Sequence, residues 1–167
     1  MNGKKESLTA KENMEKWDKA LDEYENSIGL PPSVSNYSNS EARSFMSMGR
    51  KQIEKLSPED CAQAALILNE MSLHVQRAFN REMARVNWAE DTIKDVVADD
   101  VGNHSGYSYQ ERYYKAVKNN EYAKKLSKIK KYAQQRADRL TYVANSFNTR
   151  ADIFLSIQRA KRYNNAG

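Results

Sequence analysis

Three arginines, Arg77, Arg81 and Arg85, are the residues whose type and spacing most clearly suggest a chemical role. They are four residues apart, so on a helix they project from one face. Guanidinium groups in such a row repel one another unless anions lie between them. The phosphates of a nucleic acid could supply those anions, because arginine binds phosphate through paired hydrogen bonds. Glu70 and Glu82 could supply them instead as salt bridges inside the protein or its oligomer, and the sequence leaves both interpretations open.

The C-terminal part of the chain carries a second basic feature. Residues 108–167 contain 14 lysines and arginines and 4 acidic residues, whereas residues 1–107 contain 13 and 18. An excess of ten positive charges attracts polyanions. Tyrosines are interleaved with these cations, and cations beside flat rings are the two components of single-strand binding. The opposite interpretation is that the lysines form a solvated helix face and the tyrosines pack in a core or an interface.

These features together predict a nucleic-acid interface that does not read sequence. Lysines and arginines would displace counterions from phosphates, while aromatic rings, including that of Trp88, would stack on unpaired bases. The candidate residues are Arg77, Arg81, Arg85, Trp88, Lys124, Lys125, Lys128, Lys131, Tyr132 and Arg136.

The sequence offers little for catalysis. The glycines are too sparse for a phosphate-binding loop of the G-x-x-x-x-G-K-[ST] or G-x-G-x-x-G type. One cysteine and two histidines are too few for a zinc cluster or a catalytic triad. Glu70 and His74 lie four residues apart, but a metal ion needs further ligands. We therefore expect a protein that is not an enzyme and has no metal or cofactor, with Cys61 as a small core residue.

The distribution of proline and glycine predicts which elements position these residues. No proline follows Pro58, and in that remainder the only glycines are Gly102, Gly106 and Gly167. A β-protein needs a turn signal roughly every 8–12 residues. The expected fold class is therefore all-α.

Capping signals and apolar spacing predict four helices. The first follows the capping box Thr9–Glu12 and ends at Gly29. Its apolar seam consists of Met14, Trp17, Leu21, Tyr24 and Ile28. A short second helix runs from about Glu41 to Lys55, with Gly49 on its inner side.

Two long helices follow. Ser57 and Pro58 are typical of a helix start, and the apolar seam that follows them continues for about 40 residues to Val97. A polar break at residues 99–106 leads to the last helix, which begins at the capping box Ser108–Glu111 and reaches about Arg162. A short break between two long helices implies an antiparallel hairpin.

One hairpin cannot bury both long seams and the aromatic-rich first helix, so we expect a homo-oligomer. The alternative is a monomeric bundle whose first two helices fold back onto the hairpin. The composition divides the chain into residues 1–40, a helix with a linker rich in proline, serine and asparagine, and residues 41–167, the hairpin domain. No apolar run is long enough for a bilayer span and no export signal is evident. We therefore expect a cytoplasmic protein without a membrane partner.

Two segments resemble the UvsY-type recombination mediators of phages. Arg81-Glu-Met-Ala-Arg85-Val-Asn-Trp88 is similar to the basic, aromatic helix of that family. The stretch from Tyr114 through Tyr132 and Arg136 to Arg159 is similar to its long C-terminal helices. The resemblance covers about residues 60–163, so the first helix and the linker fall outside it.

The resemblance implies a small, helical, ring-forming protein in the cytoplasm of a phage-infected cell. Such a protein binds single-stranded DNA and helps a RecA-like recombinase replace single-strand binding protein on it. Arg81, Arg85 and Trp88 would lie on the DNA-contacting helix, and Tyr132 and Arg136 on the C-terminal helix. The rival hypothesis is a structural or scaffolding coiled-coil protein whose basic helix docks an acidic protein partner.

Overall fold

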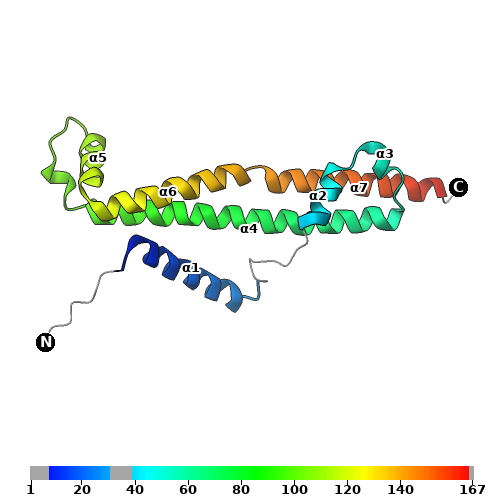
Figure 1. Cartoon of the computed structure of the whole chain (residues 1–167), viewed down its shortest axis with the longest axis horizontal. Helices are drawn as coiled ribbons and strands as arrows, with labels where there is room; N and C mark the ends of the chain where they lie inside the picture. Colours follow the sequence, from blue (N-terminus) through cyan, green and yellow to red (C-terminus); the bar gives the residue numbers. More distant parts are fainter. Residues whose placement is uncertain (1–7, 31–38, 166–167) are drawn as a thin grey trace. The chain divides into compact units, whose positions relative to one another are not determined.

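The computed structural model describes residues 8–30 and 39–165, and helices are the regular elements of these ranges (Figure 1). The helices are α1 (Ala10–Ser27), α2 (Asn39–Ser47), α3 (Arg50–Ile53), α4 (Pro58–Val97), α5 (Tyr109–Asn119), α6 (Glu121–Leu140) and α7 (Val143–Asn165), with a 3₁₀ turn at Val101–Asn103. No β-strand occurs in the described ranges, so the all-α prediction is confirmed.

Hydrogen bonds between residues three apart begin the three helices whose caps were predicted. The Thr9 hydroxyl accepts a hydrogen bond from the Glu12 N–H at 3.2 Å, and the Glu12 carboxylate accepts one from the Thr9 N–H at 2.7 Å. The Ser57 hydroxyl accepts from the Asp60 N–H at 3.0 Å, and the Ser108 hydroxyl accepts from the Glu111 N–H at 3.1 Å. These bonds satisfy amide groups that the helix itself leaves unpaired.

Two predicted helices are interrupted. The short second helix is two helices, α2 and α3, because Gly49 has an extended backbone and precedes α3 as its N-cap. The last helix is three helices, α5, α6 and α7. Asn120 is extended, and its carboxamide oxygen accepts a hydrogen bond from the Ala123 N–H at 3.0 Å, which starts α6. Tyr142 has a left-handed backbone with φ of 65°, which separates α6 from α7.

The described helices form two compact units. The first contains α1, residues 81–97 of α4, α5, and α6 as far as Ala137. In this unit α6 runs antiparallel to α4, because Lys130 contacts Glu90 at 2.7 Å while Arg136 contacts Glu82 at 2.8 Å. Its core consists of Ala10, Ile93, Val97, Val101, Ala116, Ala123 and Leu126.

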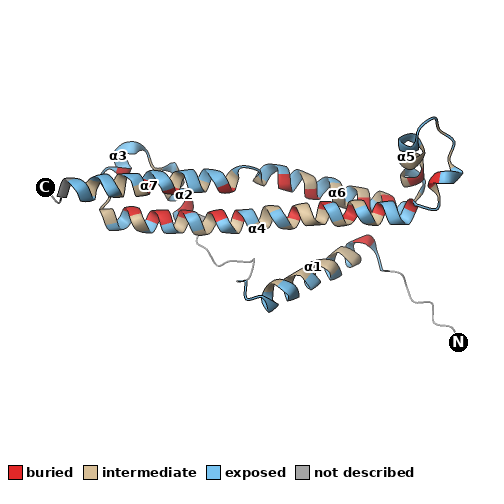
Figure 2. Ribbon diagram, turned by 180° about the vertical axis from the view of Figure 1, so that it is seen from behind, coloured by how far each residue is buried: buried red, intermediate tan, exposed pale blue. Residues whose placement is uncertain are grey.

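The second unit contains α2, α3, residues 58–80 of α4, and the chain from Asp138 through α7. The Ser72 hydroxyl donates a hydrogen bond to the Ala144 carbonyl at 2.9 Å, and Cys61 shares a core with Phe154, so α7 also runs antiparallel to α4. Figure 2 shows buried residues on the sides of these helices that face each other. The antiparallel pairing of the predicted hairpin is therefore present in each unit, and Cys61 is a core residue as expected.

Helix α1 packs against other helices of its own chain inside the first unit. Ala10 is buried in the core, and the Asn13 carboxamide donates a hydrogen bond to the Tyr122 hydroxyl at 2.7 Å. Tyr24 and Ile28 are exposed, so the buried seam of α1 ends before them. This is the folded-back arrangement of the monomeric alternative, and the homo-oligomer stays a prediction.

The two compact units do not follow the division at residue 40. Both units contain helices from residues 41–167, and one of them also contains α1. The predicted linker, residues 30–40, lies largely outside the described residues.

Candidate nucleic-acid interface

The outer side of α6 holds five of the predicted site residues. Ala123, Leu126, Ala133 and Ala137 are buried, which fixes the rotation of the helix about its axis. At about 100° per residue, the opposite side presents Lys125, Lys128, Lys131 and Tyr132, which are exposed, and Lys124, which is half-buried in the first turn of the helix. We call Lys124, Lys125, Lys128, Lys131 and Tyr132 the basic face of α6.

Most of the positive charge on the basic face is not compensated. Lys124 pairs with Glu121 in the first turn of the helix. Among the described residues, no carboxylate lies within ion-pair distance of Lys125, Lys128 or Lys131. The hydrogen bond from Lys124 lowers the pKa of Glu121, and the charges of Lys125 and Lys128 lower it further. These ammonium groups can attract a phosphate chain, and the exposed ring of Tyr132 beside them offers one surface on which a base can stack.

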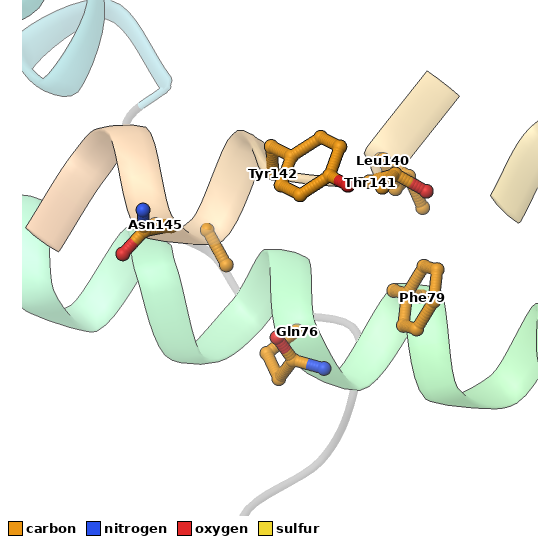
Figure 3. A pocket seen from close by; sticks show the side chains of 7 residues that line it. Gln76, Phe79, Leu140, Thr141, Tyr142 and Asn145 are labelled. Atoms are coloured by element: carbon orange, nitrogen blue, oxygen red, sulfur yellow. The ribbon is translucent and has the colours of Figure 1, made fainter. Parts of the chain in front are cut away.

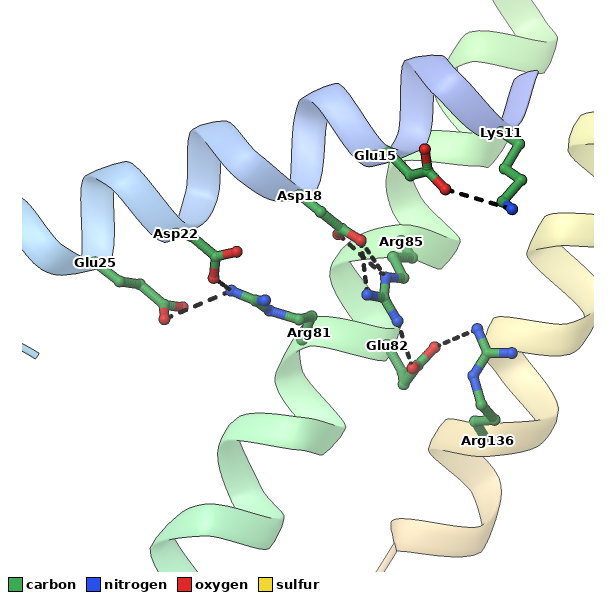
Figure 4. Close-up of polar contacts among 9 residues, drawn as sticks. All are labelled: Lys11, Glu15, Asp18, Asp22, Glu25, Arg81, Glu82, Arg85 and Arg136. Atoms are coloured by element: carbon green, nitrogen blue, oxygen red, sulfur yellow. Dashed lines mark hydrogen bonds and ion pairs between the residues drawn. The ribbon is translucent and has the colours of Figure 1, made fainter. Parts of the chain in front are cut away.

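The two arginines Arg81 and Arg85 lie against carboxylates of α1 (Figure 4). Arg81 pairs with Asp22 and, at 3.6 Å, with Glu25. Arg85 donates hydrogen bonds to Asp18 from Nη2 at 2.6 Å and from Nε at 3.1 Å, and this hydrogen bonding raises the pKa of Arg85. The side chains of Arg81 and Arg85 are only 17% and 20% exposed, so little of either is accessible to a phosphate.

Glu82 extends this network toward α6. It is buried and accepts a hydrogen bond from Arg85 at 2.6 Å, and its second carboxylate oxygen lies 2.8 Å from Arg136 (Figure 4). Of the two glutamates that the sequence offered as intramolecular partners, Glu82 takes that role. The salt-bridge interpretation therefore describes the observed contacts of Arg81 and Arg85, and Arg136 also has a carboxylate partner.

The remaining candidates on α4, Trp88 and Arg77, are also partly buried. The ring of Trp88 stacks on that of Trp17, with centroids 6.1 Å apart and an angle of 29° between the planes, and it packs against the core of the first unit. Arg77 is partly buried and belongs to the second unit. The structure thus brings five of the six α6 candidates together on one open face, and places Arg81, Arg85, Trp88 and the sixth, Arg136, in contacts within the first unit.

Sequence reasoning missed the acidic side of α1. Asp18, Asp22 and Glu25 are spaced four and three residues apart, so they share one side of α1 as Arg81 and Arg85 share one side of α4. Complementary spacing of opposite charges on two predicted helices was the available signal. It becomes decisive only when the two helices are known to pack together.

A pocket of about 220 Å³ lies in the second unit beside the break between α6 and α7 (Figure 3). Its lining consists of Gln76, Phe79, Leu140, Thr141, Tyr142, Ala144 and Asn145. None of these side chains is basic, acidic or a histidine, so the pocket offers no cation for a phosphate and no acid–base pair. It is not part of the interface described above.

Comparisons with known proteins leave the chain without a family assignment, because no family, curated protein or solved structure matches it. The resemblance to the UvsY-type mediators therefore stays a prediction. Among the described helices, none contains an apolar stretch of the length that a membrane span requires. Within the same ranges, no three acidic, histidine or cysteine side chains are grouped so that they could hold a metal ion.

Proposed function

We propose that this protein is a non-enzymatic accessory protein that binds single-stranded DNA through the basic face of α6. The supporting observation is a row of exposed lysines without acidic partners, next to an exposed tyrosine ring, in the part of the chain that carries the positive charge. The lysines would release counterions from the phosphates, and Tyr132 would stack on a base without reading its identity.

The resemblance to the UvsY-type mediators extends this proposal. The protein would act as a homo-oligomer that helps a RecA-like recombinase displace single-strand binding protein in the cytoplasm of an infected cell. The acidic residues of α1 that hold Arg81 and Arg85 would keep those arginines out of the interface. The strand would then follow α6 and not the α1-facing side of α4.

A titration of labelled oligothymidine at several salt concentrations tests the proposal. An oligonucleotide of about 20 nucleotides exceeds the roughly 4–16 nucleotides of known single-strand sites. With four lysines neutralising four phosphates at about −0.7 each, log affinity should fall against log salt with a slope of about −3. Fluorescence anisotropy measures both the affinity and the slope.

The variant that tests the site combines Lys125→Ala, Lys128→Ala and Lys131→Ala. Its slope should flatten to about −1, because only one of the four phosphate contacts remains. The matched control replaces Lys11, Lys16 and Lys19, three exposed lysines of the acidic helix α1, and removes the same net charge. The control should keep the wild-type slope.

Three outcomes contradict the proposal. The first is an absence of binding at low salt, and the second is an equal loss of affinity in the two triple variants, which would show that only net charge matters. The third is tight binding of polyglutamate without binding of the oligonucleotide. That result would assign the basic face to an acidic protein partner, as the rival hypothesis requires.

A further inference from the structure

Exposed tyrosine rings gather at α5, close in sequence to the basic face. Tyr109 and Tyr114 are 63% and 62% exposed, and Tyr107, just before the helix, is fully exposed. Large rings in water leave apolar area unburied, which on a folded surface often marks a binding site. These rings are among the described residues of the first unit, the unit that also holds the basic face.

The two α5 rings are held in position by a third tyrosine. Tyr113 packs against the core of the first unit. Its ring stacks on that of Tyr109, with centroids 6.3 Å apart and an interplanar angle of 23°, and meets the edge of Tyr114 at 6.1 Å. The Gln110 carboxamide also donates a hydrogen bond to the Tyr114 hydroxyl at 3.3 Å. Because the rings are already ordered, stacking a base on them loses little conformational entropy.

Cations follow these rings along the chain. Lys118 is one turn beyond Tyr114 on the same side of α5, is exposed, and has no carboxylate within ion-pair distance among the described residues. Lys115 is held by Glu111 at 3.4 Å and by the Ser105 carbonyl at 2.7 Å. The basic face begins directly after Asn120, which joins α5 to α6. Exposed rings followed by unpaired ammonium groups offer a strand stacking surfaces for its bases and cations for its phosphates.

We infer that Tyr109 and Tyr114 form a stacking platform for unpaired bases of a nucleic-acid strand whose phosphates lie on the α6 lysines. This inference rests on the proposed function and adds the element that distinguishes strand types. The face of a base in a duplex is covered by its neighbours, so the platform gains contacts only from a single strand. The α6 lysines, by contrast, attract any phosphate chain.

An abasic strand separates the two contributions. It has the phosphates and sugars of an oligothymidine of the same length and lacks the bases. The wild-type protein should bind the intact strand at least about tenfold more tightly than the abasic strand, because each of the two rings stacks on a base. A double variant with Tyr109→Ala and Tyr114→Ala should lose most of this preference, keep only the part that Tyr132 contributes, and keep the salt slope of the wild type.

Two further variants make the result specific to the rings. Tyr109→Phe with Tyr114→Phe keeps the rings and removes the hydroxyls, so it should retain the preference for the intact strand. Tyr163→Ala, which removes a ring that is 84% exposed on α7 in the second unit, should leave the preference unchanged. Far-UV circular dichroism of each variant establishes that the helices are intact.

The inference is refuted if the wild-type protein binds both strands equally, or if the double alanine variant keeps the full preference. In both cases a steep salt slope would leave the phosphate contacts of the proposed function standing, and equal binding of the two strands by the wild type would also count against stacking on Tyr132. If neither strand binds at low salt, the proposed function fails and the platform fails with it.

Discussion

Replacing Arg85 by alanine separates a structural role of the arginine row from a nucleic-acid role. In the wild type, Arg85 donates hydrogen bonds to Asp18 at 2.6 Å and to Glu82 at 2.6 Å. The side chains of Asp18 and Glu82 are only 15% and 12% exposed, so water replaces the lost partner poorly. The variant leaves the largely desolvated Asp18 without the arginine that pairs with it, and leaves Glu82 with Arg136 alone.

The expected loss of stability follows from these contacts. A hydrogen bond to a charged group contributes about 1.5–3 kcal/mol, and removing one partner of a buried ion pair costs about 3–5 kcal/mol. Because the three side chains retain some contact with water, we expect the low end of that range, about 3 kcal/mol. For a chain of this size, that corresponds to a decrease in Tm of about 6–12 °C.

Thermal unfolding followed by circular dichroism measures this effect, with Arg50→Ala as the matched control. Arg50 pairs with Glu54 at the same 2.6 Å, but its side chain is 88% exposed, so its removal should leave Tm essentially unchanged. Equal Tm values for Arg85→Ala and the wild type, together with a large loss of DNA affinity, would refute the structural assignment. That result would assign Arg85 to the nucleic-acid interface.

Three further predictions concern single side chains. The hydrogen bonds that Lys130 and Lys94 donate to the Glu90 carboxylate lower the pKa of Glu90. The stabilising contribution of Glu90 is therefore present above pH 4.5, its ordinary pKa, and is lost as the pH falls through the lowered value. Glu90→Gln should therefore make stability less dependent on pH in acid, which urea unfolding between pH 3 and 6 measures. Cys61 is fully buried, and burial raises the pKa of its thiol. A thiol reagent should therefore react with Cys61 only after unfolding. Fast reaction in the native state would contradict the placement of Cys61 in the core. Tyr142→Gly should raise the free energy of unfolding by about 0.5–1 kcal/mol. The reason is that relief of the strained left-handed backbone at Tyr142 outweighs the added freedom of glycine in the unfolded chain. A lower Tm of the variant would count against backbone strain at this position.

The helix starts could be predicted because the interactions that define them are local. Thr9, Ser57 and Ser108 each cap a helix through an amide group three residues away, so the sequence window contains both partners. The start of α6 had the same kind of local signal, because Asn120 is a preferred N-cap residue and accepts a hydrogen bond from the Ala123 N–H, but the prediction of one continuous last helix did not use it. The interruption at Tyr142 could not be predicted in this way. Tyr142 is neither a proline nor a glycine, and the backbone there depends on packing that the window does not contain.

The sequence by itself determined the helical fold class, the capped starts and the concentration of positive charge after residue 107. Only the tertiary structure decided which cations are neutralised. Asp18 and Asp22 are separated from Arg85 and Arg81 by 67 and 59 residues, and their charges meet because α1 packs on α4. The basic face of α6 has no such helix over it among the described residues. Charge composition is additive along a chain, whereas ion pairing depends on distance in space, and packing sets that distance.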